Sequence, residues 1–457
     1  MIVIGNILLV LYLFFTIKIL EKVSNGKFFY LLLYIIFFLP LYTVFQSLIY
    51  LCFKNEILID AIKFSKDIIL YFSFFILLFG KKGSIFDRKF HLSFLDKLML
   101  LFFVHILIYL IAPIGDATFL LKAIYAKNLF LIPALYYVGR NISISEAEWN
   151  STVAIFKSLV LIIFSFAVVE FIFSTHFHSL VEYSEYNLAI NNFYPEGNYD
   201  LAWTFENVNG KPRYAAFFSN PLALSASLLC YISIFFSELF FSNKKIIFYI
   251  LITSIIFYLA FSRSPILGAL QIFTVFIVIK SFKWLLYSLF ISIISLLSIS
   301  FFASDDFLYY LEDTFYFVEP SSLGHLFEWI QSIISIYENP FGIGLTKSGN
   351  ALSVIDDAKV GGENQFLIFG VQLGVIFMII YILIILKSII NGFKTFEYSK
   401  IVSNKKIGLT LFLLKIGLVI PALTSNIEIY LFVSLFSWLL VGINENIYNK
   451  IIVHDSL

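Results

Sequence analysis

The stretch FLIFGVQLGVIFMIIYILIIL occupies residues 366–386 and contains no charged side chain. A helix rises about 1.5 Å per residue and the hydrocarbon core of a bilayer is about 30 Å thick, so about 20 apolar residues suffice to cross it. Similar runs recur along all 457 residues, of which 60% are hydrophobic and 13% charged, whereas soluble domains carry about a quarter charged residues. The sequence therefore predicts an all-α, polytopic integral membrane protein whose single transmembrane domain covers residues 1–457.

The apolar runs predict about 12–13 transmembrane helices. The first run, from Ile2 to Ile17, lacks a preceding basic stretch and a following small-residue cleavage site, which favours a retained helix over a signal peptide. The thirteen candidate spans are 2–17, 28–53, 67–80, 97–113, 118–138, 152–174, 215–240, 246–261, 264–280, 284–303, 363–386, 407–421 and 427–446.

The distribution of Lys and Arg predicts the orientation of the chain. Short cytoplasmic loops carry an excess of these residues, and one alternating set of loops holds more than twice as many of them as the other set. Placing the richer set in the cytoplasm puts the two long loops, residues 175–214 and 304–362, on the periplasmic side. Long connections of this kind are usually functional or disordered, and these two contain too many aromatic residues for disorder. We therefore expect folded caps over a membrane cavity.

Several function classes are disfavoured. The 31 basic residues are balanced by 30 acidic ones, so no polybasic surface is available and nucleic acid is not expected as a partner. Cys52 and Cys230 lie inside apolar runs and are interpreted as buried hydrophobes. His176 and His178 form a pair without further ligand residues, so we predict neither a metal nor another cofactor. No inverted repeat indicates a secondary transporter.

Two arginines stand at span boundaries. Arg213 lies in GKPRYAAFFSNP, just before a predicted span, and Arg263 lies in the tight turn of FSRSPILG between two spans. Arginine presents a fork of donors that suits phosphate, and a helix N-terminus next to Arg263 also favours anions. The residues alone leave two other interpretations open: a snorkelling interfacial arginine for Arg213 and an ordinary flanking arginine for Arg263.

Two further segments precede or begin the span at 363–386. HLFEWIQSIISIYENPFGIGL, from His325 to Leu345, predicts an interfacial amphipathic helix followed by Gly342 and Gly344, which permit sharp turns or close approaches. A plain surface helix fits equally well. In GGENQFLIFGVQLG, Glu363 is predicted in the first helical turn, where it accepts a proton from a sugar hydroxyl or merely stabilises the helix start.

Weaker candidates were assigned to substrate binding. Asn364 directly follows Glu363, and Lys122 is predicted near the outer end of the span at 118–138, where it adds positive charge to the cavity or snorkels to the interface.

Taken together, the four segments resemble the membrane family of O-antigen polymerases and O-antigen ligases. The shared pattern consists of an arginine in the first long loop, a later S-R-S turn, an amphipathic stretch ending in PFGIG, and Glu-Asn at the next helix start. The resemblance covers about residues 205–390. It implies a metal-independent glycosyltransferase in the bacterial inner membrane, whose donor is an oligosaccharide on undecaprenyl pyrophosphate.

The resemblance also implies roles for particular residues. Arg213 and Arg263 stabilise the pyrophosphate leaving group, Glu363 activates the acceptor hydroxyl, and His325, Asn364, Lys122, Gly342 and Gly344 contribute to substrate binding. The chain departs from the family pattern at His325, where relatives often carry Arg, and at Glu363, where ligases place His. The second departure favours a polymerase of repeat units.

The same resemblance implies membrane lipid, a chain-length regulator and a flippase of the pathway as partners. Two alternatives to polymerisation remain: a ligase that transfers glycan to lipid A core, and a flippase or transporter of the lipid-linked sugar.

Overall fold

The computed structural model describes residues 2–80, 92–193, 195–207, 210–241, 243–281, 316, 320–350 and 359–455. Helices dominate this part of the chain. They are α1 (Ile2–Ser24), α2 (Phe29–Phe38), η1 (Leu39–Leu41), α3 (Tyr42–Phe53), α4 (Glu56–Phe79), α5 (Phe94–Ile111), α6 (Phe119–Gly139), α7 (Glu146–Phe173), α8 (Phe177–Leu180), α9 (Tyr183–Asn191), η3 (Trp203–Phe205), α10 (Pro221–Phe240), η4 (Lys244–Ile246), α11 (Ile247–Ala260), α12 (Arg263–Lys280), α15 (Pro320–Glu338), α16 (Gln365–Tyr398), α17 (Val402–Gly417), α18 (Val419–Thr424), η6 (Ile427–Ile429) and α19 (Leu431–Asp455).

The predicted all-α membrane fold is confirmed. Ten helices or helix pairs in the described part are long and apolar enough to cross a membrane. Every predicted span falls on a helix except 284–303, which lies outside the described residues together with much of the predicted second loop, 304–362. The chain is a multi-pass membrane protein. The division into one domain with two periplasmic loops stays a prediction.

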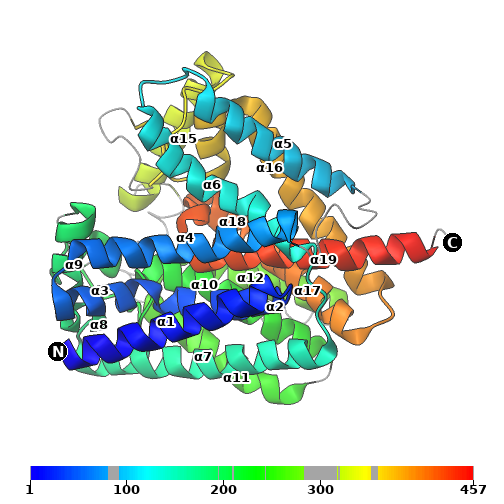
Figure 1. Cartoon of the computed structure of the whole chain (residues 1–457), viewed down its shortest axis with the longest axis horizontal. Helices are drawn as coiled ribbons and strands as arrows, with labels where there is room; N and C mark the ends of the chain where they lie inside the picture. Colours follow the sequence, from blue (N-terminus) through cyan, green and yellow to red (C-terminus); the bar gives the residue numbers. More distant parts are fainter. Residues whose placement is uncertain are drawn as a thin grey trace.

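The long helices form one bundle with two distinct ends. Most of them run roughly along the long axis in Figure 1, while α5, α6, α15 and α16 lie obliquely over one side. The short helices α8 and α9 lie near the N-terminus at one end, which we call the α8–α9 end, and the C-terminus lies at the other.

Side-chain caps set several helix boundaries. Ser93 and Ser145 each form a capping box, with Asp96 and Glu148 three residues later, at the starts of α5 and α7. The start of α10 at Pro221 differs from the predicted 215, because the preceding backbone is not helical: Ala216 has φ 50°. Proline suits the first turn of a helix, where no intrahelical N–H bond is lost.

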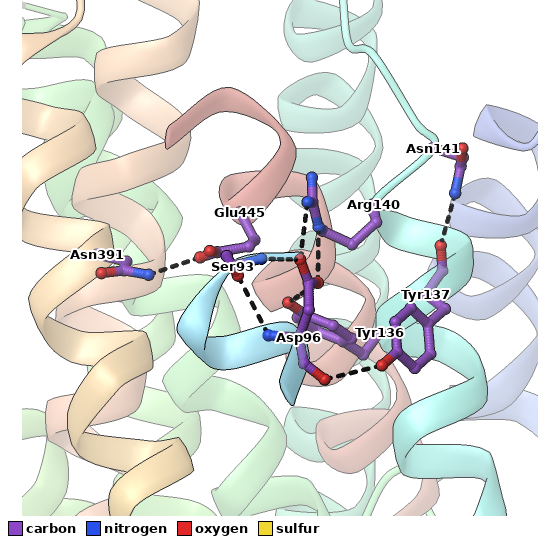
Figure 2. A network of polar contacts seen from close by, with 8 residues as sticks. All are labelled: Ser93, Asp96, Tyr136, Tyr137, Arg140, Asn141, Asn391 and Glu445. Atoms are coloured by element: carbon purple, nitrogen blue, oxygen red, sulfur yellow. Dashed lines mark hydrogen bonds and ion pairs between the residues drawn. The ribbon is translucent and has the colours of Figure 1, made fainter. Parts of the chain in front are cut away.

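A buried polar network joins α5, α6, α16 and α19. Figure 2 shows Arg140, at the end of α6, pointing its guanidinium at Asp96 of α5, with two hydrogen bonds of 2.9 Å. The Tyr136 hydroxyl donates to the same carboxylate at 2.6 Å. Nearby, Asn391 of α16 donates to Glu445 of α19 at 2.6 Å. Burial of these charges requires such pairing, so the network fixes how the four helices meet.

Candidate functional site

Arg213 lies in a short segment that backbone hydrogen bonds hold at the α8–α9 end of the bundle. Its backbone N–H donates to Phe205 O at 2.8 Å, and the next residue, Tyr214, donates to Leu259 O in α11 at 3.2 Å. The Arg213 side chain is partly buried. Since Leu259 precedes Arg263 by four residues, the backbone carrying Arg213 is attached next to the turn that carries Arg263.

Glu170, near the end of α7, organises the same segment. Its carboxylate accepts hydrogen bonds from the Phe177 N–H at 2.8 Å and the Ala216 N–H at 2.9 Å, and the residue is 2% exposed. A buried carboxylate is tolerated when such donors satisfy it. The sequence analysis missed Glu170, because its donors are backbone groups that leave no motif.

His176 and His178 pack against the segment that precedes α10. The His176 ring lies against Tyr199, Phe205 and Tyr214, and His178 Nε2 contacts Phe218 O at 2.7 Å. Burial lowers the pKa of His176 to about 4, and burial likewise lowers the pKa of His178 to about 3. Both rings are therefore neutral at physiological pH.

Arg263 is the first residue of α12 and is partly buried. The preceding turn contains Phe261 in the left-handed region, with φ 40°, followed by the extended Ser262. This geometry ends α11 at Ala260 and allows α12 to begin at Arg263, only two residues later. Arg263 thus stands at the positive end of a helix, as the sequence predicted.

Glu363 pairs with His325. The carboxylate Oε2 contacts His325 Nδ1 of α15, and the two side chains remain 34% and 26% exposed. Glu328 faces the same pair one turn along α15. Burial, together with repulsion from Glu363, raises the pKa of Glu328 above its usual value, against the opposing attraction of Lys359 and His325. A carboxylate held by an imidazole beside a second carboxyl is an arrangement suited to proton transfer.

The sequence analysis did not single out Glu328. It follows His325 by three residues and so shares its helix face, a signal that could have been used.

Helix α18 contacts both α12, which begins with Arg263, and α16, which begins two residues after Glu363. Immediately after α18, the Glu428 N–H donates to Gln365 Oε1, two residues beyond Glu363, at 3.1 Å. The two arginine-bearing segments and the Glu363 segment are therefore linked through α11, α12 and α18.

A charged pair supports this arrangement from inside the bundle. Glu428 accepts from Tyr381 Oη at 2.6 Å and from Trp438 Nε1 at 2.9 Å. Lys415 Nζ lies 3.7 Å from the centre of the Trp438 ring and donates to Ser437 Oγ at 3.2 Å. Both charges line a small cavity of about 20 Å³.

The remaining candidates have structural contacts in this fold. Asn364 caps α16 by accepting from the N–H groups of Phe366 and Leu367. Lys122 is 4% exposed and donates to Ala112 O at 3.0 Å. The predicted substrate-binding roles of Asn364 and Lys122 remain predictions.

The glycine segment fits a break in α16. Gly374 has φ 87° and ψ 167° inside that helix, so its neighbours lose their helical hydrogen bonds. The backbone of the PFGIG segment replaces them: Ile343 N donates to Val371 O at 2.8 Å and Gly344 N to Gln372 O at 3.0 Å.

Gly342 and Gly344 have φ of 79° and 106°, a region that glycine adopts without strain. A Cβ on Gly342 would lie 2.6 Å from Gly374 N. The two glycines thus allow the backbone of the PFGIG segment to pack closely against its neighbours. Their predicted contact with substrate stays a prediction.

A family comparison covers most of this site. Residues 248–382 match the family model described as O-antigen ligase. The chain carries an O-antigen ligase family domain. The resemblance inferred from the sequence is confirmed. No curated protein matches the chain. Within the O-antigen ligase domain lie Arg263, His325, the two glycines, Glu363 and Asn364, whereas Arg213 precedes it.

The matched domain indicates the general kind of activity. It implies a glycan-transferring membrane enzyme of the O-antigen ligase and polymerase type that acts on lipid-linked glycans. Polymerase and ligase activities both fall within this description.

Proposed function

We propose that the protein polymerises undecaprenyl-pyrophosphate-linked oligosaccharide repeat units at the periplasmic face of the bacterial inner membrane. The observation that carries the proposal is the contact of Glu363 with His325, just before α16. An acceptor hydroxyl needs a proton acceptor, and the leaving group needs positive charge. We assign the first role to Glu363 and the second to Arg213 and Arg263, and the contacts of α18 with both α12 and α16 support this assignment.

The proposed reaction transfers a glycan between two lipid-linked chains. An acceptor hydroxyl oxygen attacks the anomeric carbon of the donor glycan, its proton passes to the Glu363 carboxylate, and the bond to pyrophosphate breaks. Arg213 and Arg263 stabilise the charge that develops on the departing undecaprenyl pyrophosphate. His325 holds Glu363 in place for this step. Because arginine supplies the positive charge, the mechanism requires no metal.

Polymerisation also defines the expected partners. A flippase would deliver the lipid-linked units to the outer face, and a chain-length regulator would act on the growing product. The competing ligase function predicts transfer of a finished chain to lipid A core, and Glu363 in place of the ligase histidine favours the polymerase.

The products in cells test the proposal. In a deletion strain, polymerase activity predicts that the ladder of glycan lengths on a gel collapses to a single repeat, and that the intact gene restores it. Arg213→Ala and Arg263→Ala are each expected to abolish the ladder while the protein is still inserted in the membrane. Lys211→Ala, an exposed position in the same segment as Arg213, should leave the ladder intact. Complete but unattached chains in the deletion strain would instead show a ligase.

A further inference from the structure

A second group of cations lies between α4 and α6, apart from the candidate site. Lys66 and Lys127 both pair with the carboxylate of Asp67, with Lys66 Nζ at 3.2 Å from Oδ1 and Lys127 Nζ at Oδ2. Lys63 lies within electrostatic reach of both lysines. We call Lys63, Lys66 and Lys127 the lysine cluster.

The lysine cluster carries more positive than negative charge. Its two nearby carboxylates, Asp60 and Asp67, leave one ammonium group without a matching negative charge. The side chains of Lys66 and Asp67 are only 8% and 9% exposed. A charge inside a membrane protein is costly unless it is compensated, so an anion from outside the chain is the natural complement.

The cluster is accessible from the surface of the bundle. The Lys127 side chain is 36% exposed, and the adjacent Asn128 is exposed as well. The flanking surface is apolar, with Phe64 61% and Ile68 58% exposed. In a membrane protein, such a surface contacts lipid, where an ammonium beside a carboxylate that it shares with Lys66, and an exposed amide, favour a further polar partner.

The cluster lies close to the α8–α9 end. Lys63 Nζ donates to Asn191 Oδ1, at the end of α9, at 3.2 Å. Lys66 and Asp67 follow within about one helical turn, or about 5 Å. This depth suits a lipid headgroup in the leaflet next to α9 rather than a group in the bilayer centre.

We propose that the lysine cluster binds the phosphate-bearing headgroup of a second lipid-linked substrate. The chemistry it recognises is a lipid phosphate ester, and we assign the polyprenyl pyrophosphate rather than a phospholipid. The assignment rests on the proposed polymerase function, in which donor and acceptor each bring a lipid pyrophosphate and only one of them can occupy the region of Arg213 and Arg263.

Counting bound lipids tests the proposal. Purified protein in nanodiscs of zwitterionic lipid is titrated with undecaprenyl pyrophosphate and, in parallel, with phosphatidylglycerol, and native mass spectrometry counts the ligands. The wild type should bind two undecaprenyl pyrophosphates. The double variant with Lys63→Gln and Lys127→Gln should weaken one binding event at least tenfold. Lys127→Arg in otherwise wild-type protein keeps the positive charge and should retain that event. Both substituted lysines are partly exposed, so the variant is expected to fold.

The controls separate this proposal from the proposed function. Lys54→Gln changes an exposed lysine that pairs with Glu182 and Glu185, and both binding events should persist. Two pyrophosphates bound to the double lysine variant would overturn the proposal, as would lysine-dependent binding of phosphatidylglycerol with equal affinity. If only the proposed function is wrong, the double variant with Arg213→Ala and Arg263→Ala would still bind both pyrophosphates, and one of these binding events would still depend on the lysine cluster.

Discussion

At the scale of single residues, the assignment of Glu363 as the proton acceptor can be tested with one substitution. Glu363→Gln keeps the size and hydrogen-bonding capacity of the side chain but removes its basicity. General-base catalysis contributes about 10²–10⁴-fold, so we expect turnover of lipid-linked repeats to fall at least a hundredfold with little change in KM. Glu338→Gln, at an exposed position at the end of α15, is the matched control. Wild-type turnover in Glu363→Gln would remove Glu363 from the mechanism.

The buried ring of His176 makes the stability of the protein depend on pH. Burial lowers the pKa of His176 in the folded protein to about 4, whereas the same side chain in the unfolded chain has a pKa of about 6.5. Between these two pH values the unfolded chain binds a proton that the folded protein does not bind. The free energy of unfolding therefore falls as the pH drops from about 6.5 to 4. His176 contributes about 2 kcal/mol to this loss between pH 7 and 5. His176→Phe, which retains the ring contacts, should reduce the loss of melting temperature over that interval. An identical loss in the variant would contradict the buried neutral ring.

At this scale, short motifs predicted local geometry better than they predicted long-range partners. Arg263 is predicted at a helix start and lies there. Glu363 is predicted in the first helical turn, but it lies two residues before α16, which begins at Gln365 after the Asn364 cap. Glu428 escaped notice, because the donors around it come from α16 and α19, which no local pattern connects.

At the scale of elements, the broken helix α16 determines how the PFGIG segment docks. Gly374→Ala would place a side chain in a backbone region that is essentially restricted to glycine, at a cost of about 1–3 kcal/mol, and its Cβ would lie 2.8 Å from Pro340 O. We expect a lower melting temperature and reduced activity. Gly324→Ala in α15, where a Cβ meets nothing within 4 Å, should be neutral or slightly stabilising.

Hydropathy predicted the helices well but could not predict this break. An apolar run reads the same whether its helix is continuous or interrupted, and the hydrogen bonds that replace those lost at Gly374 come from a segment about 30 residues earlier. The same limitation explains α10. The apolar run begins at residue 215, where the helix was predicted to begin, but the helix itself begins at Pro221.

At the scale of the whole molecule, the Asp96–Arg140 pair joins α5 and α6 beside the Asn391–Glu445 bond that joins α16 and α19 (Figure 2). Breaking a buried ion pair typically costs about 3–5 kcal/mol, so Asp96→Asn should markedly lower the melting temperature in detergent. Glu21→Gln disrupts an exposed pair with Lys18 on α1 and should have a small effect, because exposed pairs contribute at most about 1 kcal/mol. Equal melting temperatures for both variants would show that the network does not hold the bundle together.

Reconstitution of the purified protein tests whether the protein itself joins lipid-linked repeat units. The protein is placed in liposomes with undecaprenyl-pyrophosphate-linked repeat units, without an ion gradient, other proteins or added metal, and the glycan lengths are measured. The account predicts products of two or more repeats and released undecaprenyl pyrophosphate, both lost with Arg263→Ala and with Glu363→Gln. Repeats that remain single with the wild-type protein, or move across the bilayer without being joined, would contradict it.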